Sequence, residues 1–170
     1  MMLSIIAAMD DNGGIGYQNR IPWHLGSDFK SFKAMTMGHH ILMGRKTYDS
    51  LGKTLPGRIH VVISRAKHLP MPEKCFLVNS LNDGIILAES HGESEAFVIG
   101  GEQIFRQALP LANRMILTRV HTACIVDVYF PSICWEEWQI TQSQGYAADE
   151  HNDYAFTIED WIRKDSKVVN

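Results

Sequence analysis

Short apolar runs alternate with helix-like stretches along the first two thirds of the chain. The runs cover 3–9, 39–44, 59–64, 75–78 and 96–101, and turn residues bound them, which predicts buried strands. The helix-like stretches cover 27–35, 45–51, 80–90 and 102–109. Apolar strands that alternate with helices predict an α/β fold, with a mostly parallel sheet and helices on both of its faces.

The last third of the chain has a different pattern. Stretches 114–121, 138–145 and 154–162 are strand-like, and no helix of useful length separates the last two. Two strands joined in this way favour antiparallel pairing. With 170 residues, of which 45% are apolar, the chain is expected to form one domain over 1–170, with about 163–170 as a loose tail.

Composition argues against several classes of protein. The net charge is −3, so neither a nucleic acid nor a membrane surface is expected as a partner. The apolar runs are far shorter than the roughly 20 residues that span a bilayer, and no signal peptide is expected. Cys75, Cys124 and Cys134 lack a C-x-x-C spacing, which indicates reduced thiols in a cytoplasmic protein. The eight His residues do not form a recognisable metal-ligand motif, so no metal site is expected.

One carboxylate stands alone among large apolar side chains. Asp28 is the only acid between positions 12 and 48, a segment with five Lys or Arg residues. Its apolar neighbours in the sequence are Trp23, Leu25, Phe29 and Phe32. A charge in such surroundings is costly unless it is paired. Asp28 either caps a helix that begins near Ser27, or shares a helical face with Phe32 and holds a flat ligand that carries adjacent N–H donors.

The segment IGGEQIF at 99–105 places two glycines where a strand meets a helix. Glycine lets the backbone come close to a ligand, and free N–H groups at a helix start bind phosphate. The alternative is a tight strand-to-helix turn with no ligand. A complete G-x-G-x-x-G is absent from the sequence, so a standard Rossmann dinucleotide fold is not supported.

A second strand-to-helix junction, MGRKT at 43–47, carries basic residues. Arg45 and Lys46 in a first helical turn oppose the helix dipole, and a bound phosphate would explain their presence. Ser64 and Arg65 end the next strand, and parallel strands end at the same edge of a sheet. These side chains are predicted either to surround one phosphate or to form a solvated basic rim.

These motifs resemble one family when they are taken in order. The sequence is similar to dihydrofolate reductases from Leu3 to about Ile162, through SIIAAM (4–9), GGIG (13–16), IPWHL (21–25), Asp28 with Phe32, MGRKTYDSLGKTLPGR (43–58), VVIS (61–64), VIGGEQIF (98–105), ILT (116–118) and DVYFP (127–131). The resemblance implies NADPH-dependent reduction of 7,8-dihydrofolate to 5,6,7,8-tetrahydrofolate by hydride transfer to pterin C6, a reaction that supplies one-carbon metabolism. It also implies a monomer that binds dihydrofolate and antifolate inhibitors. The implied fold is an eight-stranded twisted sheet, parallel except for its C-terminal strand, with about four helices.

The resemblance also assigns roles to particular residues. Asp28 would bind the pterin, and Thr118 would support the carboxylate of Asp28. Trp23 would position a water. Arg58 would pair with the glutamate α-carboxylate of the substrate. The substrate-binding residues would be Ile6, Ala8, Asp28, Phe29, Phe32, Lys33, Leu51, Leu55, Arg58, Ile99 and Thr118. The cofactor-binding residues would be Ala8, Ile15, Gly16, Asn19, Ile21, Gly44, Arg45, Lys46, Thr47, Ser64, Arg65, Ile99, Gly100, Gly101, Glu102, Gln103, Ile104 and Phe105.

Three positions depart from the family pattern. Phe105 replaces a Tyr near the cofactor, and Ile21 replaces a Met in the loop 14–23, which is expected to close over the nicotinamide. Val126 stands where Gly is frequent, which puts contacts between that loop and the segment around Asp127 in question. Two alternatives stay open: a reductase of a ribosylated pyrimidine on the same fold, and a non-catalytic nucleotide-binding protein. The pyrimidine reductase would need neither the W-H-L…D…F spacing nor Arg58.

Overall fold

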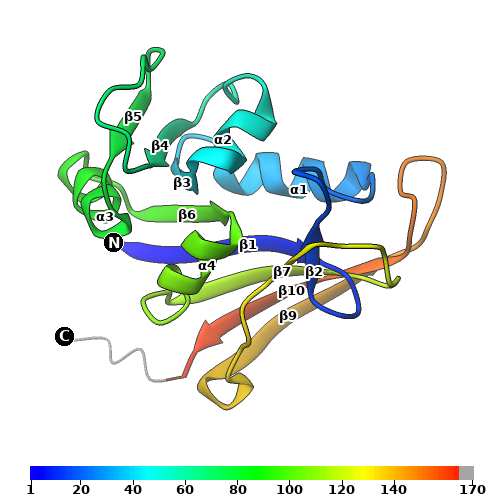
Figure 1. Ribbon diagram of the computed structural model, residues 1–170. Coiled ribbons are helices and arrows are strands. Elements are labelled where there is room, and N and C mark those ends of the chain that lie inside the picture. Colours follow the sequence, from blue (N-terminus) through cyan, green and yellow to red (C-terminus); the bar gives the residue numbers. More distant parts are fainter. Residues whose placement is uncertain (165–170) are drawn as a thin grey trace.

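The computed structural model describes residues 1–164 and is built on one eight-stranded sheet (Figure 1). The strands of this sheet are β1 (Met2–Met9), β3 (His40–Gly44), β4 (Ile59–Ile63), β5 (Cys75–Val78), β6 (Glu95–Gly100), β7 (Arg114–Val120), β9 (Trp138–Tyr146) and β10 (Phe156–Arg163). Their order across the sheet is β5-β4-β3-β6-β1-β7-β10-β9. Only β10 runs against the others, since it is antiparallel to both β7 and β9. The predicted sheet, with its one reversed C-terminal strand, is confirmed.

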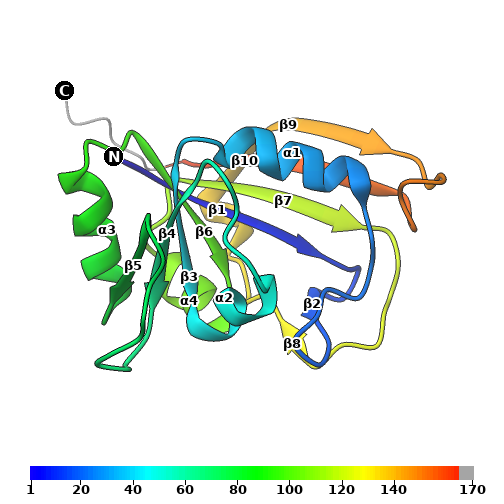
Figure 2. The same cartoon turned by 90° about the horizontal axis from the view of Figure 1, so that it is seen from above.

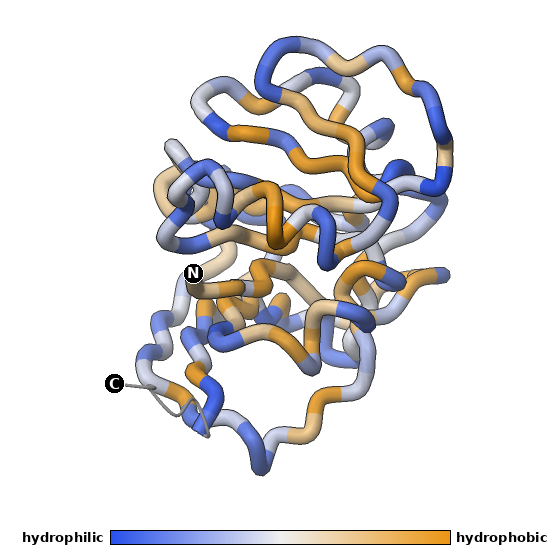
Figure 3. Tube along the Cα trace, turned by 90° about the vertical axis from the view of Figure 1, so that its left-hand side faces the viewer, coloured by the Kyte–Doolittle hydropathy of each residue, from blue (hydrophilic) through white to orange (hydrophobic). Residues whose placement is uncertain are grey.

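Within residues 1–164, four helices cover the sheet, two on each face (Figure 2). They are α1 (Gly26–Thr36), α2 (Arg45–Leu51), α3 (Leu81–Ser90) and α4 (Glu102–Ala108). Neighbouring residues of a strand point to opposite faces, so Ile5 packs in the core beneath α3 and α4, while Ile6 packs in the core beneath α1 and α2. Apolar segments therefore run through the strands, and hydrophilic segments lie mainly in the peripheral loops (Figure 3).

Two very short strands form a second sheet that the sequence did not predict. β2 (Gly14–Gly16) pairs antiparallel with β8 (Val128–Tyr129), and a 3-10 helix at Trp135–Glu137 follows. Asp10, which is buried, joins the two segments because its carboxylate accepts from the N–H groups of Gly14 (2.8 Å) and Cys124 (3.0 Å). Strands of three and two residues are too short to show a period of two, so sequence patterns could not find them.

Val126 does not prevent contact between these two segments. The N–H of Asp127 donates to the carbonyl of Gly16 (3.0 Å), and the carboxylate of Asp127 accepts from the N–H of Gln18 (3.0 Å). A Cβ atom at Gly14 would lie 2.7 Å from the side chain of Val126, so a larger residue at position 14 would collide with it. The glycine makes room for the valine, and the contact that the sequence put in question is present.

The C-terminal end of the described chain is part of the sheet. Arg163 is the last residue of β10, and the N–H of Lys164 donates to the carbonyl of Glu137 (2.9 Å). The remainder of the predicted tail, 165–170, lies outside the described residues. None of the helices within 1–164 has both the length and the apolar composition needed to span a membrane.

Glu93 lies at the amino ends of β3 and β6, in a cluster of histidines. Its carboxylate accepts hydrogen bonds from His39 Nδ1 (2.8 Å), from His40 Nδ1 (2.6 Å) and from the backbone N–H of His40 (2.9 Å). Burial alone would raise the pKa of Glu93, but these hydrogen bonds and one from the N–H of Glu95 lower it to about 2. The carboxylate is therefore ionised and paired wherever the protein is folded at neutral pH.

We expect Glu93→Gln to lower the free energy of unfolding at neutral pH by about 1–3 kcal/mol. A depressed carboxyl pKa gives stability that is present above pH 4.5 and is lost as the pH falls toward 2, so the variant should also show a flatter pH dependence in that range. Urea titrations of both proteins across this range measure the difference. Glu89→Gln, an exposed acid of α3, serves as the control, and equal acid sensitivity of all three proteins would contradict the assignment.

Candidate active site

The carboxyl ends of the central strands bring distant segments together at one edge of the sheet. In the register of the sheet, Ala8 of β1 lies opposite Thr118 of β7, and Met43 of β3 lies opposite Gly100 of β6. The helices α1, α2 and α4 all begin near this edge (Figure 2). Ligands of open α/β sheets bind in such a place, outside the carboxyl ends of the strands.

Asp28 lies in the first turn of α1 and contacts β7. Its Oδ1 accepts a hydrogen bond of 2.6 Å from the hydroxyl of Thr118. The helix has Leu25 as its N-cap and no side-chain cap bond, so Asp28 does not cap it. The carboxylate is partly buried, and burial raises its pKa, although the hydrogen bond from Thr118 opposes the shift.

Apolar side chains from several elements form one wall next to α1. Phe32 of α1, Leu51 of α2 and the nearby Leu55 are partly buried, and they pack against a core that contains Ile6; Ile99 of β6 packs there too. Ala8 packs instead with Trp23, which is 7% exposed and belongs to a neighbouring cluster.

Two other predicted substrate residues are exposed. Phe29 is 49% exposed, and its ring centroid lies 5.7 Å from that of His24. Lys33 is also exposed. Leu25, the N-cap residue of α1, is 1% exposed and packs in the same cluster as Trp23.

Arg58 is held in the core by a tight turn. The segment 55–58 has Pro56 and then Gly57 with a φ of 77°, the arrangement of a type II turn, and the N–H of Arg58 faces the carbonyl of Leu55 (3.4 Å). Arg58 is 6% exposed, yet its Nε and Nη1 atoms have no hydrogen-bond partner. Burial lowers the pKa of this guanidinium. A buried cation with two free donors is prepared to receive an anion.

His60 supports the turn that carries Arg58, and sequence reasoning missed it. Its Nε2 accepts a hydrogen bond of 3.0 Å from the N–H of Leu55, and the ring is 1% exposed. Burial lowers the pKa of His60, and the charge of Arg58 lowers it further. The imidazole therefore stays neutral and can serve as an acceptor. The only signal in the sequence for this role was that His60 lies two residues after Arg58.

The two glycines at the end of β6 form a crowded junction. Gly100 and Gly101 are joined by a cis peptide bond, and Gly100 has a φ of 122°. A Cβ atom at Gly100 would lie 3.1 Å from the ring of Phe105, and one at Gly101 would lie 3.3 Å from Thr47 Oγ1. Thr47 of α2 therefore lies directly beside the start of α4. Only glycine leaves this backbone open to a ligand.

Of the basic residues at the start of α2, Lys46 is exposed, whereas Arg45 is half-buried and paired. Arg45 Nε donates to both oxygens of Asp49 (2.9 Å each), and Lys46 is exposed. Ser64 Oγ accepts from the N–H of Ala66 (3.2 Å), and Arg65 is exposed. The first turn of α2 contains no acid. Of the four groups that were expected to surround a phosphate, Arg45 is thus already paired with Asp49.

The remaining predicted cofactor residues are in varied places. Ile15 and Gly16 belong to β2, Gly44 precedes α2, and Asn19, Ile21 and Gln103 are exposed. Glu102 pairs with Arg106 at 2.6 Å. Ile104 and Phe105 are buried in the core, and the Phe105 ring lies 5.0 Å from that of Phe130. Within residues 1–164, no three His, Cys, Asp or Glu side chains are arranged to hold a metal ion.

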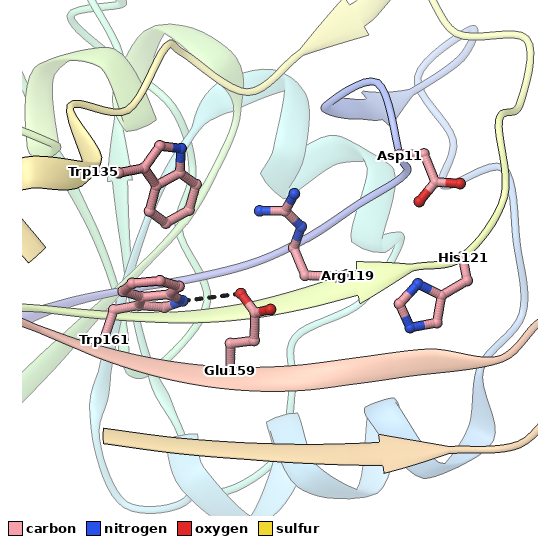
Figure 4. Close-up of a pocket in the computed structure, with 6 residues that line it drawn as sticks. All are labelled: Asp11, Arg119, His121, Trp135, Glu159 and Trp161. Atoms are coloured by element: carbon pink, nitrogen blue, oxygen red, sulfur yellow. Dashed lines mark hydrogen bonds between the residues drawn. The ribbon is translucent and has the colours of Figure 1, made fainter. Parts of the chain in front are cut away.

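Two cavities lie away from Asp28. The first, of about 280 Å³, opens on the sheet face opposite α1, and Figure 4 shows the residues that line it: Asp11, Arg119, His121, Trp135, Glu159 and Trp161. In it the Arg119 guanidinium lies 5.6 Å from the centre of a Trp135 ring. The second, of about 570 Å³, lies beside α1 and is lined partly by Met35 and Ile158. Because Asp28 lines neither cavity, we assign neither to the chemistry of the site.

The fold is an α/β sheet that carries the Gly100-Gly101 junction and the partly buried carboxylate of Asp28 at the edge where ligands of such sheets bind. Comparisons with known proteins agree. The family model for dihydrofolate reductase matches residues 2–163. The chain therefore belongs to the dihydrofolate reductase family, and it is an NADP-dependent oxidoreductase.

Individual relatives are similar over nearly their whole length. The dihydrofolate reductase of Bacillus subtilis (strain 168) is 38% identical over 165 residues, which are 97% of this chain and 96% of that protein. The type 3 dihydrofolate reductase of Salmonella typhimurium is 39% identical, over 91% of this chain and 94% of that protein. The structure of dihydrofolate reductase from Enterococcus faecalis complexed with NADP(H) and RAB-propyl superposes with a TM-score of 0.90 at 30% identity, covering 96% of this chain and 97% of that chain.

Proposed function

We propose that this chain reduces 7,8-dihydrofolate to 5,6,7,8-tetrahydrofolate with NADPH and thereby supplies one-carbon metabolism. The observation that carries the proposal is the partly buried carboxylate of Asp28, which is hydrogen-bonded to Thr118 at the ligand edge of the sheet in a chain of this family. Dihydrofolate presents adjacent N–H donors on a flat apolar ring. A carboxylate beside an apolar wall is complementary to such a ring.

Asp28 would bind the 2-amino group and N3 of the pterin. Each charge-assisted hydrogen bond of this kind contributes about 1.5–3 kcal/mol. Asp28 would lie on the far side of the ring from N5, so a water is the proposed proton donor to N5, and Trp23 is proposed to position a water near Asp28. The carboxylate would stabilise the cationic pterin electrostatically. Bound NADPH supplies the hydride that pterin C6 receives.

The substrate would lie against the apolar wall. Ile6, Ala8, Phe32, Leu51, Leu55 and Ile99 are proposed to line the cleft, together with Phe29 and Lys33 at its exposed side. Arg58 is proposed to bind the glutamate α-carboxylate of the substrate. Its two unpartnered buried donors support this role, because a carboxylate would satisfy them.

The residues at the glycine junction fit a dinucleotide. A side chain at Gly100 would fill the space beside Phe105, whereas glycine leaves the backbone accessible. Thr47, Ser64 and the basic side chains of Arg45, Lys46 and Arg65 would hold the adenosine phosphate region. Ala8, Ile15, Gly16, Asn19, Ile21, Gly44, Ile99, Gly101, Glu102, Gln103, Ile104 and Phe105 are proposed to surround the rest of the cofactor.

We expect Arg45 and Arg65 to set the preference for NADPH over NADH, since only NADPH carries the additional phosphate. Both side chains are solvated and Arg45 is shared with Asp49, so the double variant Arg45→Gln with Arg65→Gln should lower the preference by only about 10- to 100-fold. The ratio of kcat/KM for the two cofactors measures it. Lys67→Gln, an exposed cation two residues beyond Arg65, is the control. An unchanged ratio in the double variant would exclude both arginines from this role.

The decay of NADPH absorbance with dihydrofolate tests the proposed function directly. Turnover that requires both compounds, together with a rise in melting temperature on addition of an antifolate, is the expected result. Oxidation of NADPH only with a ribosylated pyrimidine, or binding of NADPH without any turnover, would overturn the proposal. We further propose that the enzyme acts as a monomer in the cytoplasm, where its three free cysteines would stay reduced.

A further inference from the structure

The start of α1 is capped from a distant part of the chain. The N-cap residue Leu25 is apolar and makes no side-chain cap bond, although the first N–H groups of any helix need acceptors. Here the N–H of Gly26 donates to the carbonyl of His151 (2.8 Å), and the N–H of Ser27 donates to Oδ1 of Asn152 (3.1 Å). Both acceptors belong to the connection between β9 and β10, which therefore acts as a cap for α1.

Asn152 is held firmly in this position. It is 3% exposed, and it forms an isolated antiparallel bridge with Leu25. Its Nδ2 donates to Ser27 Oγ (3.2 Å) and to Asp149 Oδ1 (3.0 Å), and that same oxygen of Asp149 accepts from the backbone N–H of Asn152 (2.9 Å). These bonds determine which atom of the amide faces the helix: the oxygen meets the N–H of Ser27.

The capped residue directly precedes the carboxylate of the site. Ser27 immediately precedes Asp28 in the chain. The carboxylate of Asp28 accepts a hydrogen bond from the hydroxyl of Thr118. Asp28 is thus held on two sides: Asn152 binds the N–H of the preceding residue, Ser27, and Thr118 binds the carboxylate of Asp28 itself. We propose that Asn152 is a positioning residue for the reaction: it caps α1 from outside and sets where the carboxylate of Asp28 meets the substrate. This inference rests on the proposed function of Asp28.

The placement of Asp28 matters because its two hydrogen bonds to a pterin must form together. A misplacement of about 1 Å in a reacting group can cost up to roughly 10²-fold in rate. An uncapped first turn frays, and the carboxylate would then reach water more easily. The titratable groups around this helix start are His24, Asp149, Glu150, His151 and Asp153, and they remain when Asn152 alone is changed.

The test compares Asn152→Ala with Asp153→Ala. Asp153 lies on the same connection and accepts from the N–H of His24 (2.8 Å), but it does not cap α1, so it reports on general loosening of the connection. We expect Asn152→Ala to lower kcat/KM for dihydrofolate by about tenfold or more, with the Kd for NADPH within twofold of wild type. Asp153→Ala should keep kcat/KM within about twofold, even if its Tm falls equally.

A second measurement does not depend on turnover. Carbon-13 carboxyl NMR of the ligand-free protein follows the titration of Asp28, whose pKa burial raises. In Asn152→Ala this pKa should move back toward the ordinary value, whereas in Asp153→Ala it should not. If Asn152→Ala does not fold, Asn152→Ser, which shortens the side chain but keeps a hydroxyl, takes its place in both experiments.

Each outcome decides the question. Equal losses of kcat/KM in the two variants, or an unchanged Asp28 titration in Asn152→Ala, would overturn the positioning role. A wild-type protein without dihydrofolate turnover would refute the proposed function instead, and the NMR titration would still show whether Asn152 places the carboxylate.

Discussion

Replacing Asp28 with Asn should lower kcat for dihydrofolate at pH 7 by about 10²- to 10⁴-fold, while NADPH still binds. Asparagine keeps the size of the side chain and can still accept from Thr118, but it has no charge to stabilise a cationic pterin. It also offers only one oxygen to two donors. Steady-state kinetics together with a fluorescence titration of NADPH separates the loss of chemistry from the loss of cofactor binding.

The same substitution should stabilise the protein without ligand. The pKa of Asp28 is raised in the folded state, so its ionisation costs the folded protein more than the unfolded chain. The wild type therefore loses stability as the pH rises from the ordinary aspartate range through the raised pKa, and Asp28→Asn should not. Thermal melts of both proteins below and above that pH range show whether the wild type loses stability relative to Asp28→Asn as the pH rises.

Glu73→Gln provides the matched control for Asp28→Asn, because it neutralises an exposed acid far along the chain from the site. It should change neither kcat nor the pH dependence of stability. Near-normal turnover of Asp28→Asn at neutral pH would remove the role that we assign to this carboxylate, whatever the control does.

Replacing Arg58 with Leu should raise KM for dihydrofolate by about 10²-fold or more, since two charge-assisted hydrogen bonds to the glutamate carboxylate are lost. It should also raise the free energy of unfolding by about 1–3 kcal/mol, because Nε and Nη1 of Arg58 are buried without partners. If the variant is more stable but binds dihydrofolate more weakly, Arg58 serves ligand binding and not folding. Kinetics and urea titrations measure the two effects.

A dihydropterin without the glutamyl tail makes this experiment specific. Wild type and Arg58→Leu should reduce it with similar kcat/KM, because neither protein can use the missing carboxylate. Lys53→Met, which removes an exposed cation of the same loop, should behave as wild type with both substrates. An equal loss on the truncated substrate would show that Arg58 supports the shape of the cleft and does not bind the tail.

The sheet could be predicted from sequence because each central strand is a short apolar run with turn residues at both ends. Even the reversed last strand followed, since no helix separates β9 from β10. The small sheet of β2 and β8 could not be predicted, because two or three residues carry no periodicity. The local sequence pattern thus predicts the position of a strand only if the strand is long enough for several of its side chains to be buried.

The site divides in a similar way. Asp28 was found because one acid among apolar residues is unusual within a short stretch, and the glycines were found because two in succession separate a strand from a helix. Asn152 and Thr118 support Asp28 from positions that lie 125 residues from Ser27 and 90 residues from Asp28, so no local pattern connects them. Phe29 shows the converse limit: it is adjacent to Asp28 in sequence, yet it is exposed.

The remote cap on α1 also bears on the order in which the enzyme becomes active during translation. Asp28 is synthesised before β7 and before the β9–β10 hairpin. A growing chain can therefore form most of the sheet and still lack both supports of its acid. We therefore expect activity only after the β9–β10 hairpin has paired.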